Sequence, residues 1–129
     1  MKTPAPEVSM LEILPESQQE ILMVRATGRL TEKDYQEVLI PRLETLLNEY
    51  GKAKFLFFMD EQFQGWELGA LWDDAKFGVR HRNDFIKVAV VGGARWVEWG
   101  VKLFAPFMEG EVKTFPSDQL PQAVDWIKS

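Results

Sequence analysis

Residues 85–93, FIKVAVVGG, indicate the fold class more clearly than any other stretch of the chain. Six of the seven residues before the glycine pair are apolar, and such a run is typical of a strand in a parallel sheet that is covered on both faces. Residues 55–59, FLFFM, form a second run of this kind, which ends at Asp60. Apolar residues with helical spacing lie between the two runs, so this part of the chain is predicted to form a strand–helix–strand unit.

The helix of this unit is predicted over residues 66–82. Its core-facing stripe is predicted from apolar residues that recur every three or four positions. These residues are Leu68, Leu71, Trp72, Ala75 and Val79. The basic residues at 80–82 suit the negative pole of the helix dipole, so the helix is expected to end there.

The N-terminal part of the chain is predicted to form a hairpin followed by a helix. Apolar residues 10–14 and 21–27 are joined by a short polar segment, which favours an antiparallel pair of strands. Thr31 is a suitable N-cap for a helix that ends at Gly51. Its predicted buried stripe consists of Tyr35, Val38, Leu39, Leu43, Leu46, Leu47 and Tyr50. The stripe keeps its phase across Pro41, so one kinked helix is predicted rather than two.

The C-terminal part continues the alternation of strands and helices. A helix is predicted over residues 95–105, a short strand over 112–115, and a last helix that begins at Ser117 or Asp118. The chain therefore contains two strands and a helix, and then three further strand–helix pairs. This order predicts a single α/β domain with about four helices and a mostly parallel five-stranded sheet whose first strand is antiparallel.

The composition excludes several classes of protein. The length of 129 residues fits one domain with a sizeable core, and the absence of Cys excludes disulfides, thiol nucleophiles and Cys-ligated metals. The net charge of −5 argues against nucleic acids and anionic membranes as partners. No apolar run reaches the roughly 18 residues of a membrane span. We expect residues 1–9 to form a disordered tail rather than a secretory signal, and the protein to be cytoplasmic.

Three motifs resemble parts of known chemical sites, and each has a simpler structural explanation. Gly92 and Gly93 follow a strand, where amides can bind phosphate, but the dinucleotide motif G-x-G-x-x-G is absent, so a plain turn is favoured. His81 is the single His, with Asp84 as the nearest acid downstream, and a cap at the helix end is favoured over a general base. The side chains at positions 73 and 74 point about 100° apart, so these two acids are predicted to be solvated rather than to share a metal. No catalytic residue, metal site or cofactor is predicted.

Three segments resemble the SpoIIAA-like family of small bacterial proteins, which is related in fold to STAS domains and more distantly to the lipid-binding domain of Sec14-type proteins. These segments are VRATGRLTEKDYQEVLIPRLETLL, GWELGALWDDAKFGVRHRNDFIKVAVVG and RWVEWG. The resemblance implies a (βα) superhelix over residues 10–129. It also implies a protein-interaction role, because STAS anti-anti-sigma factors bind partners under the control of a phosphorylated Ser. The corresponding residues 60–66 contain no Ser or Thr, so that switch does not carry over.

The aromatic residues supply the candidate binding site. Trp66 and Phe77 lie on one predicted helix, and Trp96 and Trp99 lie on the next, with one buried strand between the two helices. If both helices cover the same face of the sheet, these side chains line a cleft, and Arg95 is placed to orient the head group of a ligand. The alternative is that the same rings fill the core, because aromatic stripes at helical spacing are usually core residues.

These features predict a non-enzymatic binding or protein-interaction module. The alternative is a carrier or sensor of a small lipophilic ligand, which the likeness to Sec14-type proteins favours. A hydrolase or transferase is disfavoured because the sequence offers no Ser-His-Asp order, no Cys and no metal cluster. Helices that are apolar on two faces also lead us to expect a homodimer.

Overall fold

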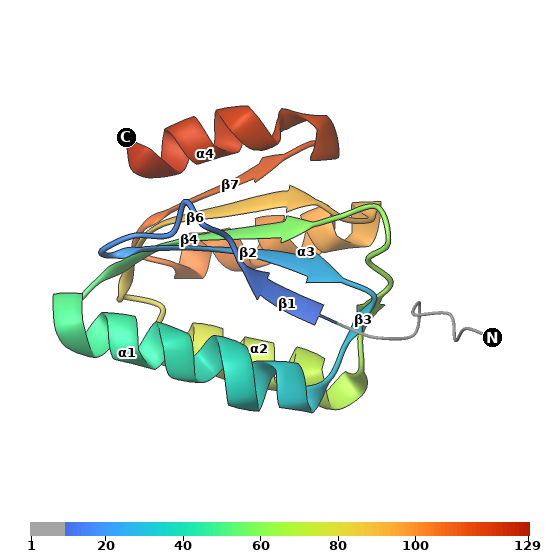
Figure 1. Ribbon diagram of the computed structural model, residues 1–129, viewed down its shortest axis with the longest axis horizontal. Coiled ribbons are helices and arrows are strands. Elements are labelled where there is room, and N and C mark those ends of the chain that lie inside the picture. The colour runs from blue at the N-terminus through green and yellow to red at the C-terminus, as the bar shows by residue number, and fades with distance from the viewer. Residues whose placement is uncertain (1–9) are drawn as a thin grey trace.

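A computed structural model describes residues 10–129, which form a five-stranded sheet with the strand order β1-β2-β4-β6-β7 (Figure 1). The strands are β1 (Met10–Ile13), β2 (Ile21–Thr27), β4 (Ala53–Met59), β6 (Phe85–Gly92) and β7 (Glu111–Phe115). Strand β1 is antiparallel to β2, and the other neighbours are parallel. The predicted sheet is therefore confirmed, whereas the tail predicted for residues 1–9 lies outside the described residues.

The helices cover the two faces of the sheet unequally (Figure 1). Those that connect neighbouring parallel strands are α1 (Ile40–Tyr50), α2 (Leu68–Arg80) and α3 (Arg95–Phe104), and all three lie on one face. The last helix, α4 (Leu120–Lys128), covers the other face alone. Short 3-10 turns, Ala105–Phe107 and Ser117–Gln119, follow α3 and precede α4. The single α/β domain with four helices is confirmed.

Each face has its own core because side chains alternate along a strand. On β6, Val88 and Val90 pack toward α1, α2 and α3, whereas Ala89 and Val91 pack toward α4. On β4, Phe57 and Leu56 divide between the two cores in the same way. The apolar run that predicted a doubly covered strand is explained by this division.

The helix that follows β2 begins and continues as the sequence predicts. The Thr31 hydroxyl accepts a hydrogen bond from the backbone N–H of Asp34 at 3.2 Å, and the Asp34 carboxylate accepts one from the Thr31 N–H at 2.8 Å. Residues Asp34–Leu39 form a π-helical segment, in which the N–H of Ile40 bonds to the carbonyl of Tyr35. The helix then runs through Pro41 into α1, so the prediction of one helix is confirmed.

The predicted core-facing stripe of α2 is wrong. Leu68 is 84% exposed and Trp72 is 65% exposed, whereas Ala70 is buried. Helix α2 packs mainly against the π-helical segment and against β5 (Gly65–Trp66), which pairs with β3 (Arg29–Leu30). The helix has apolar residues on two sides, and this packing turns the stripe that contains Ala70 inward.

Two members of the stripe predicted for the preceding helix are also misplaced. Val38 and Tyr50 are exposed, whereas the intervening Leu39, Leu43 and Leu46 are buried as predicted. Val38 lies at the margin of the stripe, where a small rotation of the helix decides the burial of a side chain, whereas Tyr50 is the last residue of α1.

Candidate functional site

A pocket of about 310 Å³ lies between α2, α3 and the face of the sheet that α1 also covers. Its floor is apolar and comes from β4 and β6. The floor residues are Phe55, Phe57, Met59, Val88 and Val90. Pockets that bind small molecules have volumes of about 300–1,000 Å³ and are lined mainly by apolar and aromatic side chains. Both the volume and the lining of this pocket suit a small apolar ligand.

Small residues keep the pocket open between the two helices. At one end, Trp66 meets Trp96 edge to face, with ring centres 5.6 Å apart. At the other end, a Cβ atom on Gly78 would lie 3.4 Å from the ring of Phe104. Between these contacts Gly100 is exposed, and a Cβ atom there would meet no other atom within 4 Å. Contacts to α3 from Trp66, just before α2, and from Gly78 of α2 therefore close the two ends and leave an opening in the middle.

The pocket has one polar end, which is formed by three side chains in a row. The Trp66 indole N–H donates to the Tyr35 hydroxyl oxygen at 2.7 Å, and the Tyr35 O–H donates to Asp74 Oδ1 at 3.0 Å. All three residues line the pocket. The row fixes the direction of the Tyr35 hydroxyl, and it places a carboxyl group against an otherwise apolar wall.

Local pairing of two short strands brings this row together. Leu30 of β3 is paired with Trp66 of β5, and the Leu30 carbonyl accepts a hydrogen bond from the N–H of Glu67. Tyr35 follows Leu30 in the first turns of the next helix, and Asp74 lies two turns into α2. The pairing therefore fixes the starts of both helices beside each other, which sets Tyr35 against Trp66 and Asp74.

The surroundings shift the pKa of both ionisable groups in the row. Burial raises the pKa of the Asp74 carboxyl group above 3.8, and the hydrogen bond from Tyr35 offsets only part of this effect. Burial, and next the negative charge of Asp74, raise the pKa of Tyr35 well above 10.0. Asp74 nevertheless keeps accessible surface, because it borders the pocket. Tyr35 is therefore a neutral hydrogen-bond donor near pH 7.

The prediction that Asp73 and Asp74 are solvated surface acids is wrong for Asp73, whereas Asp74 is exposed as predicted. Asp73 is 8% exposed, and its Oδ2 accepts a hydrogen bond from the Gln36 side chain at 3.4 Å. Asp74 faces the pocket instead. The two side chains do diverge, as adjacent helical residues must, but the π-helical segment and the pocket occupy both directions.

The structure separates the five predicted site residues into two groups. Trp66, Phe77 and Trp96 line the pocket, whereas Arg95 and Trp99 do not and are exposed on α3. The sequence reasoning did not identify Tyr35 or Asp74 as site residues. A signal for Asp74 was available, because positions 70, 74 and 77 share one side of a helix and both neighbours of Asp74 in that set are apolar.

The motifs at the two strand–helix junctions have local structural roles. His81 follows α2, where its N–H donates to the Phe77 carbonyl and its Nδ1 lies 2.7 Å from Asp84 Oδ2, so the predicted cap is confirmed. Gly92 has a φ of 82°, and a Cβ atom on it would lie 2.5 Å from the carbonyl oxygen of Met59. Only glycine allows this close turn between the ends of β6 and β4.

Residues 10–129 offer neither a cluster of metal ligands nor a membrane-spanning helix. No group of three or more His, Cys, Asp or Glu side chains in that range is placed to hold a metal ion. None of the helices within it combines the length and the apolar character that a membrane crossing requires.

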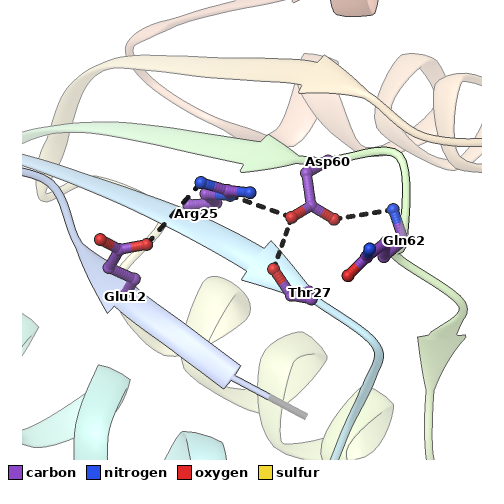
Figure 2. A network of polar contacts seen from close by, with 5 residues as sticks. All are labelled: Glu12, Arg25, Thr27, Asp60 and Gln62. Carbon is purple, nitrogen blue, oxygen red and sulfur yellow. Dashed lines mark hydrogen bonds and ion pairs between the residues drawn. The ribbon is translucent and has the colours of Figure 1, made fainter. Parts of the chain in front are cut away.

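A second polar cluster lies at the end of β4, outside the pocket (Figure 2). Asp60 Oδ2 accepts hydrogen bonds from Arg25 Nε at 2.9 Å and from the Thr27 hydroxyl at 2.5 Å, and Oδ1 accepts one from the Gln62 N–H at 2.9 Å. Glu12 lies 4.0 Å from Arg25 on the other side. Burial raises the pKa of Asp60, but the hydrogen bonds from Thr27, Arg25 and Gln62 outweigh it and lower the pKa below 3.8. This cluster joins β1, β2 and β4 and is a structural feature.

Comparisons with known proteins agree with the fold. The family model described as SpoIIAA-like matches residues 21–128. A similar solved structure is the crystal structure of an uncharacterized protein of the DUF3478 family with a SpoIIAA-like fold, from Shewanella loihica PV-4. The two chains are 30% identical, the match covers 98% of each chain, and the TM-score is 0.75. No curated protein matches the chain. The resemblance inferred from the sequence is confirmed.

Proposed function

This chain belongs to the SpoIIAA-like family, and we propose that it is a non-enzymatic cytoplasmic protein that carries or senses a small lipophilic ligand. The observation that carries this proposal is the open apolar pocket of about 310 Å³ between α2 and α3. When a lipophilic molecule enters the pocket, apolar surface of both the ligand and the protein is removed from water. This burial contributes a binding free energy of about 25 cal/mol per Å². The likeness of the family to Sec14-type lipid-binding domains supports the same class of ligand.

The polar groups of the pocket favour binding over catalysis. The lining residues offer one phenol, two indole N–H groups and one carboxyl group, and the row joins the phenol, the carboxyl group and the indole N–H of Trp66. Nucleophilic catalysis needs a nucleophile beside a base, and general acid–base catalysis needs groups with pKa values near the working pH. His81, the only His, lies outside the pocket against Asp84. The row is therefore suited to recognise a head group.

The test is a titration with decan-1-ol followed by tryptophan fluorescence, because Trp66 and Trp96 both line the pocket. We expect saturable binding by the natural chain. Gly100→Leu should weaken that binding at least tenfold, because its side chain enters the opening without meeting other atoms. Lys102→Leu is the matched control, since it adds the same side chain to an exposed position of α3. Equal affinity of the natural chain and Gly100→Leu would exclude this pocket as the binding site.

A second candidate function is self-association or protein interaction, because large apolar side chains are exposed outside the pocket. They lie on and just after α2 and α3 and comprise Leu68, Trp72, Trp99, Leu103 and Phe107. Exposed apolar groups in such number mark interaction surfaces in many proteins. The expected homodimer predicts a light-scattering mass of twice 14.9 kDa, which Trp99→Lys reduces. A mass of 14.9 kDa at high protein concentration would eliminate the dimer.

A further inference from the structure

The pocket is lined by one charged side chain, Asp74, and by no Lys, Arg or His. Arg95, the cation that the sequence placed near a ligand head group, lies outside the lining. An anionic head group inside the pocket would therefore face a carboxyl group without a neighbouring cation. When Asp74 is ionised, the two negative charges repel each other, and the ligand carboxylate also loses hydration on entering the apolar pocket. The lining thus disfavours carboxylate ligands.

Within the polar row, one hydrogen-bond acceptor receives no hydrogen bond from the described residues. Tyr35 already accepts from Trp66 and donates to Asp74 Oδ1. Within residues 10–129, no side-chain or backbone donor bonds to Asp74 Oδ2. The unused capacity of the row itself is an acceptor, so the row is complementary to a ligand that brings a hydrogen-bond donor.

We infer that the pocket selects an apolar chain that ends in a hydroxyl group, such as a fatty or isoprenoid alcohol, over the carboxylic acid of the same length. The hydroxyl group donates to Asp74 Oδ2, and the chain lies on the apolar floor of the pocket. This inference rests on the proposed function and specifies its ligand class.

A hydroxyl head group fits Asp74 in either of its protonation states. The ionised carboxylate accepts a hydrogen bond from the alcohol, and the neutral acid donates one to the alcohol oxygen. A methyl ether of similar length lacks the donor and satisfies only the neutral acid. A comparison of the alcohol, the methyl ether and the carboxylate therefore separates the effects of hydrogen-bond donation, hydrogen-bond acceptance and charge.

The experiment is isothermal titration calorimetry at pH 7.5 of the full chain with decan-1-ol, 1-methoxynonane and decanoate. We expect decan-1-ol to bind at least tenfold more tightly than either of the others. Asp74→Asn should reduce the ratio of alcohol to decanoate affinity below threefold, since it removes the charge and presents amide donors. Asp73→Asn is the matched control, because it removes the same charge from the adjacent residue, outside the pocket, and should keep the natural ratio.

Each outcome of this experiment decides something different. If the natural chain and Asp74→Asn each bind the three probes with equal affinity, the inference is overturned but the proposed function stands. Tighter binding of decanoate than of decan-1-ol by the natural chain has the same two consequences. Binding of none of them overturns both. If Asp74→Asn does not fold, the ratio in the natural chain still decides, together with Tyr35→Phe. That variant keeps Asp74, so it should keep the preference for the alcohol, and loss of the preference would make Tyr35 the recognising group instead.

Discussion

The two faces of the sheet are built from alternate residues of the same strands, yet they differ in how they are filled. Val91 on β6 has no accessible surface and packs under α4, whereas its neighbour Val90 lines the pocket. On the face that α4 covers, Ile127 fills the space above the sheet. On the face that carries the pocket, α2 and α3 present the small residues Ala75 and Gly100. The difference shows that the pocket arises from short side chains on the helices, since the strands are equally apolar on both sides.

The α4 face is also closed by contacts at the end of the chain. Lys87 Nζ donates to the Trp126 carbonyl at 3.0 Å and to the Ser129 hydroxyl at 2.7 Å. The ammonium groups of Lys87 and Lys113 lie 5.0 Å and 5.2 Å from the centre of the Trp126 ring system. These contacts hold α4 against β6 and β7, so this face is closed and contributes to stability.

Two acids, Asp60 and Asp74, repeat the contrast on a smaller scale. Asp60 receives three hydrogen bonds, and its side chain is 7% exposed. Asp74 receives one, from Tyr35, and borders the pocket. The lowered pKa of Asp60 and the raised pKa of Asp74 follow from this difference. The Asp60 carboxylate has a structural role because its oxygens are hydrogen-bonded within the protein. The Asp74 carboxyl group has an oxygen that receives no such bond from residues 10–129, and this oxygen can accept one from a ligand.

The largest expected effect is the loss of stability on truncation of the closed face. Ile127→Ala should lower the free energy of unfolding by about 3–4 kcal/mol, because it leaves a cavity under α4. Ile40→Ala, the matched change at the pocket, should cost about 1 kcal/mol, because Ile40 already borders open space. Urea denaturation measures both, and equal losses would contradict the contrast between the faces.

Removal of the Asp60 carboxylate should have the next largest effect. Asp60→Ala should cost about 1–3 kcal/mol at pH 7, because it leaves Arg25 and Thr27 without their acceptor. Because the pKa of Asp60 is lowered on folding, its contribution is present above the unfolded-state value of about 3.9 and is lost as the pH falls through the folded value. Thermal melts from pH 7 to pH 2.5 should therefore show a shrinking difference between the two proteins. A constant difference would mean that packing, not charge, stabilises this site.

The opposite sign is expected for Asp74. Because its pKa is raised on folding, its charge destabilises the folded protein at pH 7, and this penalty disappears as the pH falls through the folded and unfolded values. Asp74→Asn should thus raise the free energy of unfolding by about 0.5–1 kcal/mol, a modest gain because the group keeps accessible surface. Urea midpoints at pH 7 and pH 4 should show the gain shrinking on acidification. A destabilised variant at pH 7 would show that Tyr35 needs the charged acceptor.

Most of the fold could be predicted from the sequence because strand and helix periodicity are local properties. The orientation of α2 could not, since apolar residues lie on two of its sides and the decision between Leu68 and Ala70 depends on contacts with a distant segment. The continuity of the helix across Pro41 could also be predicted, because Pro41 lies in the first turn of α1, directly after the π-helical segment.

The candidate site was predictable only in part. Large aromatic residues on neighbouring predicted helices can be selected from the sequence as candidate site residues, and Trp66, Phe77 and Trp96 do line the pocket. The polar row could not be predicted, because Tyr35 and Asp74 are 39 positions apart and meet through the two-residue pairing of β3 with β5. A pairing that short has no periodicity to detect.

The central claim is that one face of the sheet binds a lipophilic ligand and the other does not. Nuclear Overhauser effects between decan-1-ol and the labelled methyl groups of the protein test it most directly. The account predicts contacts to Val90 and Val101, which line the pocket, and none to Val91 or Ile127 under α4. Contacts confined to the exposed side chain of Leu103, or equal contacts at Val90 and Val91, would contradict it.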